Sequence, residues 1–362
     1  MFSDPFYQTQ DSEIFVQTQC MQHEHATHNF LACMLKNLGY YETGEHKRRW
    51  QRNQKKDFYS LRQHAIVIFA DSFGLFGNIT VEPAKWFNKN TVVITDNHVL
   101  FEPEYKLLQT PSSYFGIFSY SPKNQNFNPQ RRFGLAANRF DLQRQLILLE
   151  LLRQSGGIDS VLKSDYINFN AWNPAGANNT VEDVQKTFST SWNSFKDSMP
   201  YYQQYVEQTI PQLPVKNHNL TIEQASVSAF LTLVVETYAD PAVIALSEKI
   251  FRALVTPAPW IAYAAPGTVD YLKSLGFDVL DDIVDHSYNA MPGYPEELNL
   301  RIVEYITSGL NNYENLRKLP VNALVARCET AARHNQIVLQ RMKQQWPADF
   351  AAWLPSVIAA IQ

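Results

Sequence analysis

Side chains suited to a phosphorylated ligand gather around two segments in the second half of the chain. Glu236 and Thr237 come directly after an apolar run, and the helix expected next carries Ser247, Glu248 and Lys249 in its first part. In an open α/β sheet, ligands bind at the edge formed by the carboxyl ends of the strands. The start of a helix and a lysine suit a diphosphate, and a carboxylate suits ribose hydroxyls. These residues therefore predict a nucleotide-binding edge.

A second group of residues has the side chains of a zinc site. Soft and imidazole ligands follow one another closely near the start of the chain, at Cys20, His23, His25, His28 and Cys33. His25 and His28 could share one face of a helix and bind zinc. Neither a CxxC nor an HExxH motif is present, so the pattern favours ordinary surface or core residues. We assign no metal site from the sequence.

A third group is a basic stretch with a tryptophan inside it. We call it the basic patch, and it consists of Lys47, Arg48, Arg49, Trp50, Arg52, Lys55 and Lys56. Asp57 is the acid beside it, and Arg62 follows closely. Such a stretch is either a solvated surface or a contact to the phosphates of a nucleic acid, with the tryptophan free to stack. The sequence leaves both interpretations open.

The elements that would position these groups alternate between strands and helices. In the first third, the β-branched runs 64–70 and 90–95 predict parallel strands covered on both faces, with a third strand at 114–120 and a helix at 27–38. Past a polar linker, we expect strands at 132–136, 225–237, 260–264 and 277–280, and helices at 141–154, 242–254 and 269–275. From 298 onward the chain reads as helical, with breaks at Pro320, Pro347 and Pro355. This alternation predicts a doubly wound α/β fold.

The amino-acid composition, the net charge and the absence of several motifs limit the classes of protein that this sequence could belong to. The 362 residues suggest about two domains, and 45% hydrophobic with 18% charged residues is enough for a core. The net charge of −4 disfavours a protein that coats nucleic acid non-specifically. GxGxxG, Walker A, GxSxG and HExxH motifs are absent, which disfavours dehydrogenases, P-loop enzymes, α/β hydrolases and zinc proteases.

The same composition predicts where the chain works. Three cysteines, an odd number, form no disulfide framework, so we expect a reducing compartment. The first residues show no signal-peptide pattern, and no apolar run is long enough to span a bilayer. The sequence therefore predicts a cytoplasmic protein without a membrane span.

The ordered set of motifs resembles the donor half of fucosyltransferase-like glycosyltransferases. Glu236 ends a strand, Ser247-Glu248-Lys249-Ile250 opens a helix, and Pro266-Gly267 with Tyr271-Leu272 follows the next strand. The stretch 271–277 and Asp285-His286-Ser287-Tyr288 is similar to phage-type relatives of that group, whose pattern often has Glu where this chain has His286. Asn138-Arg139 with Arg144 resembles the opening of the same donor half. The resemblance covers about residues 131–288.

This resemblance implies a fold and a set of roles. The fold would be GT-B-like, with two Rossmann-like lobes and a helical tail across their junction: an acceptor lobe at 1–126, a donor lobe at 127–312 and a tail at 313–362. A nucleotide diphosphate sugar would bind the donor lobe as co-substrate, with no further cofactor and no metal. The donor-binding residues would be Arg139, Arg144, Glu236, Thr237, Ser247, Glu248 and Lys249. Among them, Arg144 and Lys249 would neutralise the diphosphate.

An inverting transfer also needs a general base in the acceptor lobe to take the proton from the attacking hydroxyl. Asp71 directly follows the run 66–70 and is our first candidate. Asp96 and His98, after the run 92–95, are the alternatives. Each has the side chain for the task, and each also has a side chain common in turns and caps.

The sequence thus predicts an enzyme that moves a sugar onto an acceptor hydroxyl, and the acceptor remains open. A glycan comes first, because aromatic platforms and hydrogen bonds are enough to hold it. A hydroxymethylated base of phage DNA comes second, since the basic patch could grip a duplex while the base is flipped out. In that case the enzyme would act in the cytoplasm of a phage host. A third reading is a non-catalytic GT-B-like protein that uses the basic patch as an interaction surface.

Overall fold

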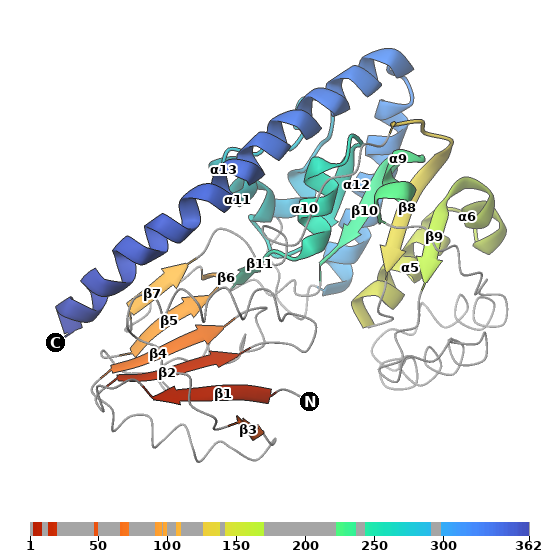
Figure 1. Ribbon diagram of the computed structural model, residues 1–362. Coiled ribbons are helices and arrows are strands. Elements are labelled where there is room, and N and C mark those ends of the chain that lie inside the picture. Colours follow the sequence, from red (N-terminus) through yellow and green to blue (C-terminus); the bar gives the residue numbers. More distant parts are fainter. Residues whose placement is uncertain are drawn as a thin grey trace. The chain divides into compact units, whose positions relative to one another are not determined.

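The computed structural model describes residues 3–8, 14–19, 47–49, 66–71, 91–95, 97–99, 106–109, 126–137, 142–169, 222–236, 243–290 and 298–361 (Figure 1). The chain forms two compact units. The first comprises Met1–Ser121, Thr237–Phe251 and Ile337–Gln362, and the second comprises Pro122–Glu236 and Arg252–Gln336. The helix expected at 27–38 and the strand expected at 114–120 lie outside the described residues.

The first unit contains a six-stranded sheet of order β3-β1-β2-β4-β5-β7. Its strands are β1 (Ser3–Gln8), β2 (Ile14–Gln19), β3 (Lys47–Arg49), β4 (Ile66–Asp71), β5 (Thr91–Thr95) and β7 (Lys106–Gln109). β4 and β5 are the two β-branched runs, and they pair in parallel as predicted. The β1 strand pairs antiparallel with both β2 and β3, so the sheet is mixed.

A two-stranded sheet in the same unit corrects one prediction. β6 (Asn97–Val99) pairs antiparallel with β11 (Val243–Ala245), at positions where we expected the first turn of a helix. Helix α10 (Glu248–Val255) begins only after that strand. A short apolar segment is compatible with a helix or with a strand, and its backbone pairing with β6 makes this segment a strand.

The second unit is built on a parallel sheet of order β12-β10-β8-β9. Its strands are β8 (Arg131–Ala137), β9 (Tyr166–Phe169), β10 (Ala229–Val235) and β12 (Trp260–Tyr263). Almost all of β10 and the whole of β12 are buried, as expected for parallel strands covered on both faces. The described part of this unit is therefore α/β, as predicted.

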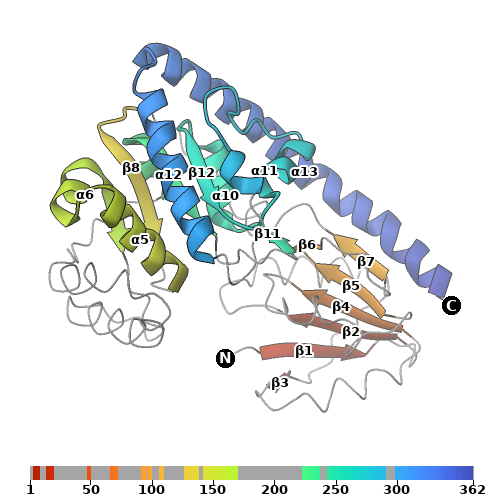
Figure 2. The same cartoon turned by 180° about the vertical axis from the view of Figure 1, so that it is seen from behind.

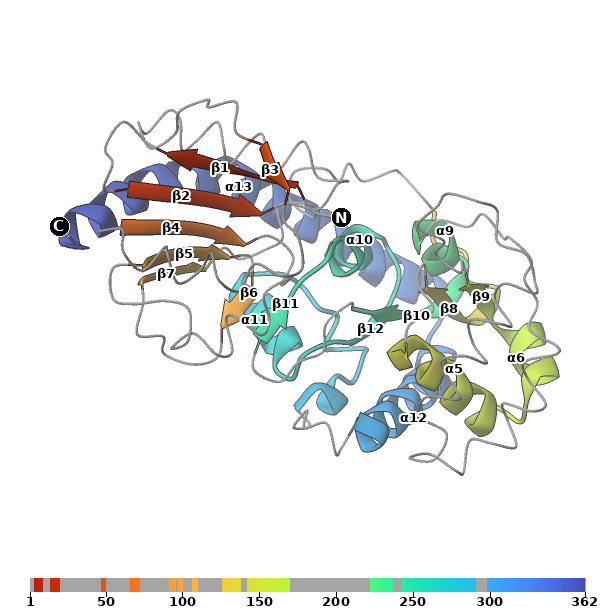
Figure 3. The same cartoon turned by 90° about the horizontal axis from the view of Figure 1, so that it is seen from below.

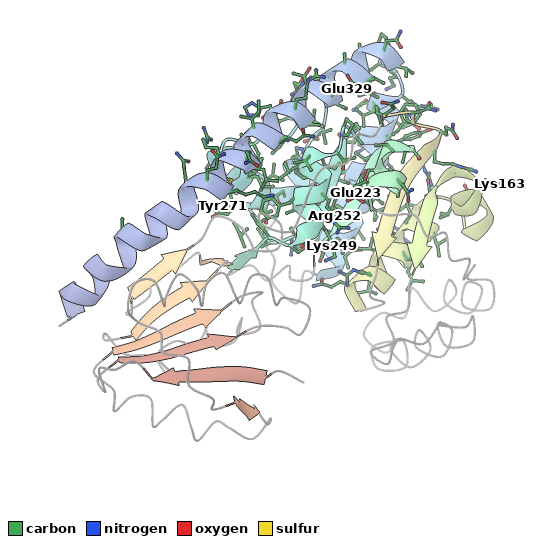
Figure 4. The ribbon with its side chains drawn as sticks, in the orientation of Figure 1. Lys163, Glu223, Lys249, Arg252, Tyr271 and Glu329 are labelled. Atoms are coloured by element: carbon green, nitrogen blue, oxygen red, sulfur yellow. The ribbon has the colours of Figure 1, made fainter. Side chains whose placement is uncertain are left out.

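Helices cover both faces of this sheet (Figures 2 and 3). α5 (Leu142–Gln154) and α12 (Leu298–Leu316) pack together on one face. α9 (Ile222–Val227) and the part of α10 that belongs to this unit lie on the other face. Gly309 lets α12 approach the sheet closely, since an added Cβ would lie 3.2 Å from the Ile261 side chain. On the opposite face, the Nε atom of Arg252 in α10 lies 3.6 Å from the Oε1 atom of Glu223 in α9, and Figure 4 labels both residues. The core of the second unit lies between these layers.

Two predicted boundaries in this unit are wrong. The strand expected over 225–237 begins at Ala229, because the preceding residues form α9. A continuous apolar run does not distinguish a buried helix from a buried strand, and here the run holds one of each. The segment expected as a strand at 277–280 belongs to no sheet.

Side chains from helices explain why 277–280 is not a strand. Asn335 of α13 (Val321–Ile361) is 1% exposed, and its Oδ1 accepts the backbone N–H of Asp278 at 2.7 Å. Its Nδ2 donates to the carbonyls of Asp278 and Leu254, both at 2.8 Å. The side-chain amide of Asn335 therefore bonds to the backbone N–H and carbonyl that would otherwise pair with a neighbouring strand.

A second asparagine holds the next part of the same loop. Asn312 of α12 accepts from the Asp285 N–H at 2.7 Å and donates to the Asp285 carbonyl at 2.9 Å. Arg327 of α13 adds ion pairs to Asp278 and Asp282. We call residues 277–286 the pinned loop, because two helices fix its backbone through side chains.

The tail is helical, and one of its three predicted breaks is present. α12 ends at Leu316 and α13 begins directly after Pro320. The breaks expected at Pro347 and Pro355 are wrong, because α13 continues through both positions over its 41 residues. Among the described residues, no helix combines the length and the apolar character needed to cross a membrane.

Candidate functional site

The strand order of the second unit reverses between β8 and β10. From β8 the chain crosses over α5 and α6 (Ile158–Ser164) to β9 on one side, and later returns to β10 on the other side of β8. β9 therefore lies on one side of β8, and β10 and β12 lie on the other. In open parallel sheets, the crevice outside the carboxyl ends of such strands is where ligands bind.

Arg144 lies at this reversal. It belongs to the first turn of α5, directly after β8, and is 2% exposed. Its Nη2 donates to the carbonyl of Val235, the last residue of β10, at 3.4 Å. The guanidinium thus links the helix that follows β8 to the carboxyl end of β10. Arginine is a preferred partner for phosphate, because its planar guanidinium donates two parallel hydrogen bonds.

Glu236 follows β10 at the same edge. Its backbone N–H donates to the carbonyl of Tyr263 at 3.0 Å, which continues the parallel pairing of β10 with β12. Glu236 is 1% exposed. A carboxylate at this edge has acceptor oxygens that can bond to the hydroxyl groups of a ligand.

Ser247 and Lys249 lie at the start of α10, and Figure 4 labels Lys249. The Ser247 Oγ accepts the backbone N–H of Lys249 at 3.2 Å, which is the bond of an N-cap residue. The Lys249 Nζ also donates to this Oγ, at 3.3 Å, and Lys249 is 8% exposed. The structure therefore gives Ser247 a capping role and buries the lysine at the helix start.

Two residues at the carboxyl edge are missing from our sequence-based set. Tyr263 ends β12 and is 2% exposed, and Arg301 in the first turn of α12 is 7% exposed. The Arg301 guanidinium lies 5.1 Å from the centre of the Tyr263 ring and donates to the Ala264 carbonyl at 2.5 Å. One signal was available: Tyr263 lies near the end of a correctly predicted strand. Arg301 gave no signal, since it lies outside the motifs on which the predicted site rests.

The start of helix α11 (Thr268–Ser274) is closed to a ligand by Asn289. The side-chain amide of Asn289 is oriented so that its oxygen faces the start of α11. This Oδ1 accepts the N–H groups of Gly267, Thr268 and Val269 at 3.0–3.2 Å. These are the donors that a phosphate would otherwise use at a helix start. The Pro266-Gly267 turn therefore has a structural role here.

His286 lies in a partly buried chain of hydrogen bonds beside β12. Its Nε2 lies 2.9 Å from the Val279 carbonyl and its Nδ1 lies 3.4 Å from the Tyr288 hydroxyl, which in turn accepts the Ala262 N–H at 2.7 Å. This pattern requires the tautomer with its proton on Nε2. Burial lowers the pKa of His286 below its usual 6.5, although the Val279 carbonyl and the charges of Asp281 and Asp285 act in the opposite direction.

We expect this histidine to make the protein less stable in acid. Because its pKa is lower in the folded than in the unfolded state, the unfolded state binds more protons as the pH falls below about 6.5, and the free energy of unfolding decreases. His286→Gln keeps a donor for Val279 but does not titrate. Urea unfolding at pH 7.5 and 5.5 should show a larger loss for the wild type than for the variant. Equal losses would contradict this role.

The remaining candidates fall into two groups. Asp71 is the last residue of β4, His98 lies in β6, and Glu248 opens α10. Arg139, Thr237 and Asp96 lie outside the described residues, as do the cysteine and histidine cluster near the start of the chain and Trp50, Arg52, Lys55 and Lys56 of the basic patch. The structure therefore does not test these candidates as a site.

The first part of the basic patch forms β3. Its register with β1 makes Asp4 the partner of Arg48, and Ser3 and Pro5 the partners of Arg49 and Lys47. An acidic residue far away in sequence thus lies opposite the middle of the strand. Local charge counting misses it, because Asp4 and Arg48 are distant along the chain.

Within the part of the chain that the structure describes, no three His, Cys, Asp or Glu side chains gather as metal ligands would. Comparisons of the chain with protein-family models, with curated proteins and with solved structures found no match. The geometry at the carboxyl edge of β8, β10 and β12 is therefore the basis for any functional assignment.

Proposed function

We propose that this protein is a glycosyltransferase whose nucleotide diphosphate sugar binds at the carboxyl edge of the β12-β10-β8-β9 sheet. The observation that carries the proposal is the position of Arg144, a buried guanidinium between the helix after β8 and the last carbonyl of β10. The strand order supports it, since β9-β8-β10-β12 is the order of a doubly wound nucleotide-binding fold. In the proposal, this sheet is one of two Rossmann-like lobes.

On the donor side, the reaction requires mainly a fixed positive charge. Breaking the sugar–phosphate bond leaves negative charge on the nucleotide diphosphate, and a fixed cation at that place stabilises the transition state. Arg144 supplies this cation, and Glu236 orients hydroxyl groups of the ribose or the sugar. Lys249, Glu248, Thr237 and Arg139 keep the donor roles that the sequence predicts for them.

The acceptor in this proposal is a glycan, and the base that activates it is Asp71, with Asp96 and His98 as alternatives. A hydroxymethylated DNA base is the competing acceptor. The pairing of Arg48 opposite Asp4 weakens the argument for DNA, since an acid lies in register with the middle of the patch strand. Gel-shift measurements with duplex DNA at low and moderate salt separate the two acceptors.

Nucleotide binding is the sharpest test of the donor site. GDP, UDP and related nucleotides at about 100 times their Kd should stabilise the wild type by about 2.7 kcal/mol. Arg144→Lys keeps the charge but loses the planar fork, so we expect about tenfold weaker binding. The control is Arg153→Lys in the same helix, where the arginine pairs with Glu150 at 2.5 Å. This variant should bind as the wild type does.

The outcomes separate the alternatives. Equal nucleotide affinity in Arg144→Lys and the wild type would contradict the donor-site assignment. Nucleotide binding without release of nucleotide diphosphate from any donor sugar would favour the non-catalytic reading. Turnover that is abolished by Asp71→Asn, with nucleotide binding intact, would support transfer with Asp71 as the base.

A further inference from the structure

Three tyrosines pack edge to face beside the carboxyl edge, and one of them differs from the others. Tyr305 lies 5.6 Å from both Tyr263 and Tyr288, measured between ring centres. The Tyr305 hydroxyl donates to the Val234 carbonyl at 3.0 Å, and the Tyr288 hydroxyl accepts the Ala262 N–H. The Tyr263 hydroxyl is buried and has no hydrogen-bond partner among the residues that the structure describes.

An unpaired buried hydroxyl is costly, and phenylalanine would avoid the cost at this position. Removing a hydroxyl from water without a new hydrogen bond costs about 1–3 kcal/mol in proteins. Buried polar groups are paired in the great majority of cases, so an exception needs an explanation. Burial raises the pKa of Tyr263 to about 12, so the hydroxyl keeps its proton at neutral pH and is available as a donor.

The surroundings of Tyr263 favour an anionic acceptor. Arg301 lies over its ring, and the charge of that guanidinium lowers the pKa of Tyr263 in opposition to burial. Tyr263 is also the register partner of Val235, whose carbonyl accepts from Arg144. Arg144 and Arg301 are both buried, and they donate to backbone carbonyls at the carboxyl ends of the neighbouring strands β10 and β12. Tyr263 is the last residue of β12, next to the carbonyl that Arg301 binds.

We propose that the Tyr263 hydroxyl donates a hydrogen bond to an anionic phosphate oxygen of the bound ligand, beside Arg301. The inference rests on the proposed function for the identity of the ligand, a nucleotide diphosphate sugar. It adds a binding residue from β12 and one from α12 to the edge that Arg144 and Glu236 mark. It also explains why the chain keeps a hydroxyl that has no hydrogen-bond partner among the described residues.

Tyr263→Phe tests this directly, because it removes only the hydroxyl. Thr232→Val is the matched control: the Thr232 Oγ1 is also buried without a partner among the described residues, but it lies in the middle of β10, away from the edge. Both variants should melt at the same temperature as the wild type or higher. Nucleotide diphosphate affinity should fall about tenfold in Tyr263→Phe alone, which corresponds to about 1.4 kcal/mol.

Inorganic pyrophosphate, as a second probe, separates this inference from the proposed function. Weaker pyrophosphate binding in Tyr263→Phe, with no nucleotide binding by the wild type, would keep the anion site and reject the nucleotide sugar. Nucleotide binding that is equal in Tyr263→Phe and the wild type would overturn the role of Tyr263 and leave the proposed function standing. A wild type that binds neither probe would overturn both.

Discussion

Asn335→Ala should lower the free energy of unfolding by about 3 kcal/mol. The side chain satisfies three backbone groups, the N–H and carbonyl of Asp278 and the carbonyl of Leu254. Alanine leaves these groups in a site that is closed to water, and each unpaired buried group costs about 1–3 kcal/mol. Urea unfolding followed by circular dichroism measures the change.

A control on the same helix shows whether the loss is specific. Glu329 is labelled in Figure 4, and its exposed side chain faces Arg333 at 3.7 Å. Pairs of this kind contribute little, and alanine is the best helix former, so Glu329→Ala should stay within about 0.5 kcal/mol of the wild type. If the two variants were equally stable, Asn335 would not hold the pinned loop.

Gly134→Ala should cost about 2 kcal/mol or more. A Cβ at this position of β8 would lie 2.7 Å from the carbonyl oxygen of Ala225 and 3.0 Å from its carbon. Both atoms belong to the backbone of α9, so the contact is relieved only if the helix moves away from the sheet. Overpacking of this kind costs about 1–3 kcal/mol and sometimes more. Chemical unfolding of the variant gives the value.

Gly309→Ala is the matched comparison, because it adds the same methyl group. Its Cβ would lie 3.2 Å from the Cδ1 atom of Ile261, the far end of a flexible side chain. Replacing glycine by alanine within a helix contributes about 1 kcal/mol, which offsets the tighter contact. We expect this variant within about 1 kcal/mol of the wild type. Equal stability of Gly134→Ala and Gly309→Ala would show that α9 moves away from the sheet at little cost, and it would contradict the prediction for Gly134→Ala.

The sequence predicts elements well where the apolar pattern has one solution. The runs that became β4, β5 and β8 are β-branched or apolar and bounded by polar residues, and the helix α5 has its expected ends to within a residue. The errors lie where partners come from far away. An apolar run at 277–280 looks like a strand, but whether it pairs with a strand or with Asn335 depends on a helix that starts more than forty residues later.

The candidate site divides in the same way. Arg144 and Glu236 were assigned from motifs, and both lie buried at the reversal of strand order. Tyr263 and Arg301 were missed, because an unpaired hydroxyl is a property of the packed structure and not of the residue type. Ser247 was assigned to ligand binding, and in the structure its hydroxyl caps α10, a task for which serine is equally suited.

The pinned loop also sets an order of events during protein synthesis. Asp278 receives its backbone partner only when Asn335 is available, 57 positions later. At typical rates of translation this separation corresponds to roughly 3 to 11 s. Phe277, Val279 and Leu280 are at most 4% exposed in the finished fold, yet during that interval the helix that fixes them is missing. Until α13 has been made, the nascent chain therefore lacks the side chain that fixes the backbone of this apolar segment.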